Sequence, residues 1–234
     1  MKTILSIMSL LFYSTVMAQF AKIVDKDGYV NVRNDANNQS KIVGKIASGE
    51  VVYIFNHGDE FGNWLIVDYH TKNGDLLTGY VHNSRVKPLS SYETIPVAVE
   101  EKYKATFILK NIQVTIKTQK FDYEKNKNHF KTYQYPKYPF EIYKGQEVWG
   151  TDRTIPDTQY QSIQVAIDGK ETTIPQKEIE SLFNPNLELT ECFYDNKTET
   201  LFIACTNADG AGAYQLLVVI QKGKYAGRHI YQAN

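Results

Sequence analysis

Short runs of alternating apolar and polar residues, separated by turn residues, constrain the fold of this chain most. They are densest between Ala21 and Leu89, where no helical period interrupts them. A period of two predicts strands with one buried face. Several short strands in so short a segment bury their inner faces only by curling on themselves, so we expect a small β-barrel. The predicted strands span residues 29–33, 41–46, 51–55, 64–69 and 78–82.

The same segment carries three motifs in order: "YVNVRNDANNQSKIVGKIASGEVVYI", "NWLIVDY" and "TGYVHNSRVKPL". Together they resemble the bacterial SH3 (SH3b) domain, with its Asn-Val-Arg strand, polar loop, Gly-ended apolar strand, Ser-Gly-Glu turn, Trp strand and closing Gly-aromatic-Val strand. The resemblance covers residues 21–89. It departs from the family pattern in a longer turn over 69–77 and in Tyr80, where the family often has Trp. It implies a module that binds a peptidoglycan peptide or an envelope protein.

Candidate ligand-binding residues lie at the end of the first of these strands and in the loop that follows. Arg33, Asn34 and Asp35 predict a polar groove beside Tyr29, and a solvated loop explains them equally well. Trp64 alternates with aliphatic residues, and we expect it in the core because a small barrel needs one large ring. The predicted ligand-binding set is Tyr29, Arg33, Asn34, Asp35, Trp64, Tyr80 and His82.

Residues 1–18 have the pattern of a secretory signal peptide. Lys2 precedes an apolar stretch, and Val16-Met17-Ala18 forms a small-x-small cleavage site. A retained anchor is the weaker alternative, because the stretch contains Ser and Thr and is shorter than the ~20 residues of a membrane span. No cysteine follows the site, so we expect no lipid anchor. The prediction is an exported protein, soluble in the periplasm or outside the cell, with no membrane span after cleavage.

The remaining chain predicts a linker and a second domain. Residues 90–102 combine Ser, Pro and acidic residues without a core pattern, as linkers do. Residues 103–234 contain two hairpins, a terminal meander and one short helix over 176–183, which Asn184-Pro185 ends. The predicted fold class is therefore mostly β: an SH3-like small barrel plus a β-rich domain with one short helix. The tail around "NADGAGAY" resembles the C-terminal regions of exported bacterial proteins of unknown function, and this implies no activity.

A second binding surface is predicted in the C-terminal domain. Lysines and aromatic rings interleave between Lys117 and Trp149, as in surfaces that bind glycans or single-stranded polymers. The alternative is a long insertion whose rings cover a sheet while its lysines stay in solvent. The glycines after Asp209 favour a tight strand connection over an anion-binding loop, because no helix follows them. The predicted second surface consists of Tyr133, Tyr135, Tyr138 and Asp209.

The sequence offers little for catalysis. Cys205 and His229 are the pair that fits a cell-wall peptidase, but Cys205 lies in a predicted strand and not at a helix N-terminus, and we expect His229 to be exposed. The histidines have no ligand partners at zinc spacing. Lys+Arg and Asp+Glu are both 26, so no net charge attracts nucleic acid. We predict no catalytic residue, no metal, no cofactor and no nucleic-acid partner.

Cys192 and Cys205 are the two cysteines of the chain. Export favours a disulfide between them. A turn at Asn196-Lys197 places Cys192 opposite a residue near Leu201 and leaves Cys205 about 13 Å along the strand. The sequence does not decide between a disulfide and two free thiols.

These observations lead to a non-catalytic exported protein whose SH3b domain binds a cell-envelope ligand, a peptidoglycan peptide or an envelope protein. Two alternatives remain: a periplasmic inhibitor or immunity protein against a cell-wall hydrolase, and a cell-wall hydrolase with an unrecognised site.

Overall fold

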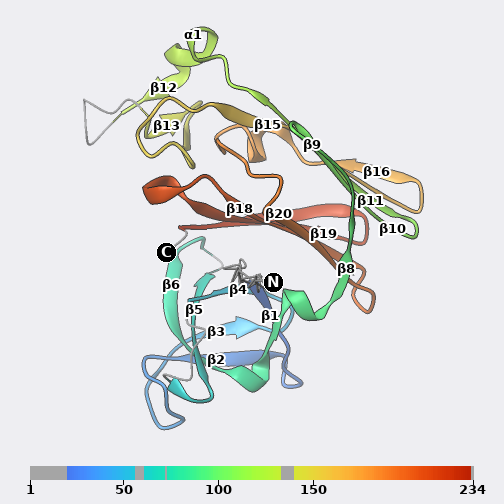
Figure 1. Ribbon diagram of the computed structural model, residues 1–234. Helices are drawn as coiled ribbons and strands as arrows, with labels where there is room; N and C mark the ends of the chain where they lie inside the picture. The colour runs from blue at the N-terminus through green and yellow to red at the C-terminus, as the bar shows by residue number, and fades with distance from the viewer. Residues whose placement is uncertain (1–19, 56–60, 72, 133–139, 233–234) are drawn as a thin grey trace, which may run out of the picture.

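The computed structural model describes residues 20–55, 61–71, 73–132 and 140–232 (Figure 1). The predicted signal peptide lies outside these residues. Strands dominate, and the α-helix of the described part is α1 (Tyr123–Asn126). Within the same residues, no helix has both the length and the apolar character needed to cross a bilayer. The predicted mostly β fold class is confirmed.

Seven strands form one antiparallel sheet in the N-terminal unit, residues 20–89. The sheet order is β3-β2-β6-β5-β4-β1-β7. The five predicted strands correspond to β2–β6, and β1 and β7 add to them. No ladder between the described residues joins the edge strands β3 and β7. The strands are β1 (Phe20–Ile23), β2 (Tyr29–Arg33), β3 (Ile42–Ala47), β4 (Val51–Ile54), β5 (Trp64–His70), β6 (Leu76–His82) and β7 (Val86–Pro88).

The core of the N-terminal unit is aliphatic, with one large ring. Val30 and Val32 point inward from β2, as its alternation requires. The ring is Tyr69, which is 4% exposed and whose hydroxyl packs against Gly44. Trp64 was expected to fill this core, and that expectation is wrong because Trp64 lies on the half-buried first part of β5, outside the buried cluster.

The predicted linker forms part of two sheets. Residues 90–102 contain β8 (Glu93–Ile95), which pairs with β17, and β9 (Val97–Glu101), which pairs with β10. Both are edge strands, and every residue of β9 is exposed. Their acidic residues and Pro96 agree with this position, since charged residues and Pro are common on edge strands, where they hinder pairing with other chains.

The C-terminal part packs two five-stranded antiparallel sheets face to face. We call them the middle sheet, with order β20-β19-β18-β17-β8, and the outer sheet, with order β16-β15-β11-β10-β9. A small sheet, β12-β13-β14, adjoins them. Their remaining strands are β10 (Lys104–Leu109), β11 (Ile112–Lys120), β12 (Phe130–Lys131), β13 (Ile142–Tyr143), β14 (Gln146–Glu147), β15 (Thr158–Ile167), β16 (Lys170–Thr173), β17 (Thr190–Asp195), β18 (Thr200–Asn207), β19 (Tyr214–Gln221) and β20 (Lys224–Gln232).

The middle sheet is buried on both faces, and this explains the continuous apolar runs of β18 and β19. Along β18, Ile203 and Cys205 face the outer sheet, whereas Phe202 and Ala204 face the N-terminal unit. Figure 1 shows the resulting three layers, with the N-terminal unit below the middle sheet and the outer sheet above it. The two halves of the chain therefore share an apolar interface.

That interface is built from large side chains. The N-terminal unit contributes Phe20, Val51, Tyr53 and Leu89, and Tyr231 of β20 stacks on Tyr53 with ring centroids 5.2 Å apart. Burial of one such side chain contributes about 1.5–3 kcal/mol. The N-terminal unit on its own would expose these side chains to water.

The predicted helix over 176–183 is a 3₁₀ turn, η5 (Gln176–Glu178), followed by bridges at Leu182 and Phe183. Leu182 and Phe183 pair with Trp149 and Gln159, so backbone contacts outcompete a helix there. The short helix of the predicted fold class is α1 instead. Asp122 caps its N-terminus by accepting the backbone N–H of Lys125.

Candidate functional site

Four of the predicted ligand-binding residues, Tyr29, Arg33, Trp64 and His82, line one pocket of about 220 Å³ in the N-terminal unit. We call it the aromatic pocket. Tyr29 and Arg33 share a face of β2 because side chains alternate along a strand. Trp64 and His82 meet because they are register partners of β5 and β6. The remaining lining residues are Asp25, Asp27, Val30, Asn31 and Arg85.

Aromatic side chains provide the apolar part of the pocket. Trp64 and His82 make an edge-to-face contact with centroids 5.4 Å apart. Tyr29 is 41% exposed, and the Nζ atom of Lys45 lies 4.0 Å from its ring centroid. These rings offer accessible faces to a ligand, which a ring buried in the core does not.

Charged groups of both signs surround the rings. Arg85 pairs with Asp25 at 3.0 Å, and the Asp25 side chain is 5% exposed. Nη1 of Arg33 donates to the backbone carbonyl of Ser40 at 2.6 Å, which fixes the guanidinium at the pocket. Asp27 is exposed in the β1–β2 turn, where its backbone N–H donates to Oδ1 of Asp25. The pocket therefore presents fixed cationic and anionic groups beside rings.

Asn31 contributes an unused hydrogen-bond acceptor. Its Oδ1 atom is buried and has no hydrogen-bond partner among the described residues. A buried acceptor without a partner costs free energy, and functional sites are a common place for this cost. The alternation of β2 predicts Asn31 beside Tyr29 and Arg33, so this signal was present in the sequence. The pairing of Asp25 with Arg85 was not, because the two residues lie far apart in the chain.

Three predicted residues lie outside the aromatic pocket. Asn34 and Asp35 are exposed in the loop after β2, where Oδ1 of Asp35 accepts the backbone N–H of Ala36. Asp35 thus orders its own loop, in agreement with the solvated-loop interpretation. Tyr80 pairs with Arg33 across β2 and β6, and its ring packs edge-on against Phe61 with centroids 5.4 Å apart.

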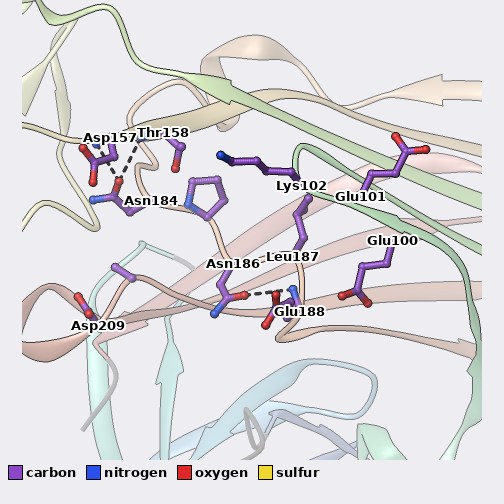
Figure 2. Close-up of a pocket in the computed structure, with 12 residues that line it drawn as sticks. Glu100, Glu101, Lys102, Asp157, Thr158, Asn184, Asn186, Leu187, Glu188 and Asp209 are labelled. Atoms are coloured by element: carbon purple, nitrogen blue, oxygen red, sulfur yellow. Dashed lines mark hydrogen bonds between the residues drawn. The ribbon is translucent and has the colours of Figure 1, made fainter.

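The predicted second surface is not assembled by the described residues. Tyr133, Tyr135 and Tyr138 lie outside them. Asp209 lines a separate pocket of about 650 Å³ in the C-terminal part (Figure 2). Carboxylates dominate that pocket, namely those of Glu100, Glu101, Asp157, Glu188 and Asp209, beside Lys102.

Asn184 and Asn186, which line this second pocket, have structural roles. Oδ1 of Asn184 accepts the backbone N–H groups of Asp157 and Thr158, and Oδ1 of Asn186 accepts that of Glu188 (Figure 2). Among the described residues, no group of three or more His, Cys, Asp or Glu could hold a metal ion. No aromatic ring is among the residues that line this pocket, so it lacks the stacking surface of the aromatic pocket.

The lysine- and aromatic-rich stretch contains a small core in its described part. Phe121, Phe130 and Tyr143 are buried together with Phe183. The ring centroids of Phe130 and Tyr143 are 4.7 Å apart. These rings follow the alternative interpretation, in which aromatic side chains cover a sheet.

Cys205 and His229 cannot form a catalytic dyad, because they lie on opposite faces of the middle sheet. Cys205 is fully buried toward the outer sheet, and burial raises the pKa of its thiol to about 11. His229 is the register partner of Leu217, which faces the N-terminal unit. The expectation that His229 is exposed is wrong, since it is partly buried beside His70.

Both cysteines are free and fully buried. Cys192 pairs with Ile203, and Cys205 pairs with Thr190, so the cysteines are diagonal neighbours. The sequence placed Cys192 opposite a residue near Leu201, but its partner is Ile203, because the β17–β18 turn is longer than the Asn196-Lys197 pair. The open question of the disulfide is thus answered in favour of free thiols.

A comparison with protein-family models gives no match for this chain, and a comparison with curated proteins also gives no match.

Proposed function

We propose that this chain is a non-catalytic exported binding protein whose N-terminal unit is an SH3b-type barrel that recognises a peptide of the cell envelope. The observation that carries the proposal is the aromatic pocket, where Tyr29, Trp64 and His82 stand beside Arg33 and the Asp25–Arg85 pair. SH3 barrels bind extended peptides along aromatic-lined grooves.

A peptidoglycan stem peptide has the chemistry that this pocket would recognise. Such a peptide carries carboxylates, an amino group and short aliphatic side chains. Arg33 offers a planar donor pair for a carboxylate. Asp27 offers an exposed carboxylate for the amino group, and the face of Trp64 offers a contact for aliphatic carbons.

The size of the pocket limits what it holds. A volume of about 220 Å³ is smaller than the ~300–1,000 Å³ typical of sites that enclose a whole small molecule. The pocket would therefore take one or two residues of a peptide, while the rest lies on the surface. Peptide binding of this kind is weak for one site and suits repeated ligands on a polymer.

Binding of the mature chain, residues 19–234, to purified sacculi tests the proposal. The full mature chain is required because the N-terminal unit buries Phe20, Tyr53 and Leu89 against the middle sheet. The tested variants are Tyr29→Ala and Asp27→Asn, both at exposed positions. Tyr103→Ala is the matched control, since Tyr103 also carries a lysine over its ring, Nζ of Lys102 at 5.3 Å, but belongs to the C-terminal part.

We expect the wild type and Tyr103→Ala to sediment with sacculi, and Tyr29→Ala to bind at least about tenfold more weakly, which corresponds to ~1.4 kcal/mol. If the wild type stays in the supernatant, the proposal fails. If it then forms a tight complex with a secreted wall hydrolase, the inhibitor alternative takes its place.

A further inference from the structure

A second concave site lies where the N-terminal unit meets the middle sheet. It is a cavity of about 600 Å³, bounded by β1, the β1–β2 turn, β7 and the β17–β18 turn. We call it the basic pocket. Its charged lining residues are Lys22, Asp25, Lys26, Lys87, Asp195 and Lys197.

Both carboxylates of the basic pocket are already neutralised. Asp195 pairs with Lys22 at 3.0 Å, and both side chains are less than a tenth exposed. Asp25 pairs with Arg85, also at 3.0 Å. Three lysines, Lys26, Lys87 and Lys197, then remain, and none forms an ion pair with a residue in the described part of the chain. The pocket therefore has an excess of positive charge although the whole chain has none.

The lysines come from three separate elements that converge on the pocket. Lys26 follows β1, Lys87 lies in β7 and Lys197 lies in the β17–β18 turn. The Nζ atom of Lys87 lies 3.7 Å from the ring centroid of Tyr92, which holds this ammonium group at the pocket wall. The salt bridge between Lys22 and Asp195 fixes the turn that carries Lys197 against β1.

We propose that the basic pocket binds a phosphate group of a sugar-phosphate ligand. Lysine ammonium groups bind phosphate as point charges, and three of them around one cavity suit the charge that a phosphate spreads over its oxygens. The volume is within the range that encloses a small ligand, so a sugar attached to the phosphate fits as well. Asp25 lines both this pocket and the aromatic pocket, so the two sites are neighbours.

This site does not depend on the proposed peptide-binding function, because it shares none of the residues tested there. Glucose 1-phosphate is the probe, with glucose and glucuronate as comparisons, in an NMR titration of the isotope-labelled mature chain. We expect glucose 1-phosphate to shift the amide signals of Ser48, Gly49, Lys87 and Thr198, and glucose to leave them unchanged.

Charge-neutral variants locate the site. The triple variant Lys26→Gln/Lys87→Gln/Lys197→Gln is expected to raise the dissociation constant at least about tenfold, because each ammonium group attracts the phosphate at short range. The matched control is Lys41→Gln/Lys120→Gln/Lys131→Gln, which removes three exposed lysines elsewhere and is expected to change the constant less than about twofold. Lys26→Gln/Lys197→Gln changes only exposed lysines and should still weaken binding at least about threefold if the triple variant misfolds.

Several results would overturn the proposal. They are absence of any shift with glucose 1-phosphate, shifts that gather away from the pocket, equal loss of binding in the two triple variants, or binding of glucuronate as tight as that of glucose 1-phosphate.

Discussion

The ammonium group of Lys22 in β1 lies 3.0 Å from the carboxylate of Asp195 in β17, and both side chains are almost completely buried. The pair joins two sheets whose strands are otherwise separate in the pairing order. Oδ2 of Asp195 also accepts the hydroxyl of Thr198. Burial acts to raise the pKa of Asp195, but its hydrogen bonds and the Lys22 charge together lower this pKa below its usual value.

The Lys22→Met variant should destabilise the protein strongly. It leaves the Asp195 carboxylate buried without its cation, which costs about 3–5 kcal/mol in comparable cases. Urea unfolding measures the change in the free energy of unfolding. Lys127→Met is the control, because the Lys127–Glu124 pair is exposed and such pairs contribute about 0–1 kcal/mol. A loss below about 1 kcal/mol for Lys22→Met would contradict this account of the interface.

Acidification should weaken the protein through His229. Burial and the neighbouring His70 lower the pKa of His229 to about 4, below its usual value of 6.5. The unfolded chain therefore binds more protons between these two values, so the free energy of unfolding falls as the pH decreases from about 6.5 toward 4. Urea unfolding at several pH values measures this fall, by about 1–3 kcal/mol.

His229→Gln serves as the comparison for this pH dependence. Carboxylates such as Asp195 titrate in both proteins, whereas the variant lacks the imidazole that packs against His70. Its stability is expected to vary less with pH over that window. Identical pH profiles for the two proteins would show that His229 does not cause the dependence.

For the described residues, the sequence predicted those parts of the fold that depend on a pattern within one short segment. The alternation of Tyr29 to Arg33 predicted β2 and placed Tyr29, Asn31 and Arg33 on one face. It did not predict that Trp64 meets His82, because that contact depends on the register between β5 and β6. The sequence also did not predict the salt bridge between Asp25 and Arg85, because it joins two segments that are distant in the chain.

Two other predictions were wrong because they depend on the neighbours of a strand in the folded protein. Residues 93–101 mix Pro, acidic and apolar residues, and this composition alone does not distinguish the edge strands that they form from a linker. His229 was expected to be exposed as a late histidine of the chain. It is partly buried because β20 carries one face toward the N-terminal unit, a layer that the sequence does not reveal.

The two thiols should be unreactive in the folded protein. Cys192 and Cys205 are fully buried, and burial raises the pKa of both thiols. Thiolate, the reactive form, is therefore scarce at neutral pH. Labelling with iodoacetamide at pH 8, followed by mass spectrometry, is expected to modify neither cysteine until urea is added. Rapid labelling without urea, or an intact mass lower by the two hydrogens of a disulfide, would contradict the buried free thiols.

Gly79 permits the close approach of β6 to β2. A Cβ atom at this position would clash with Cγ1 of Val32 and would lie 3.0 Å from the backbone carbonyl of Arg33. Gly79→Ala should therefore cost about 1–3 kcal/mol and displace Arg33 from the aromatic pocket. Leu77→Ala, at an exposed position of the same strand, is the control in thermal unfolding. Equal midpoints for the two variants would show that the strands are not closely packed there.

The fluorescence of Trp64 tests the central claim, that the aromatic pocket binds a wall peptide, most directly. The chain has two tryptophans, so Trp149→Phe reports on Trp64, and Trp64→Phe reports on Trp149, which packs against the core of the C-terminal part. In a titration with a soluble stem peptide, Trp149→Phe should show a saturating change with the dissociation constant of the wild type, and Trp64→Phe should show none. A saturating change in Trp64→Phe but not in Trp149→Phe, or no change in the wild type, would contradict the claim.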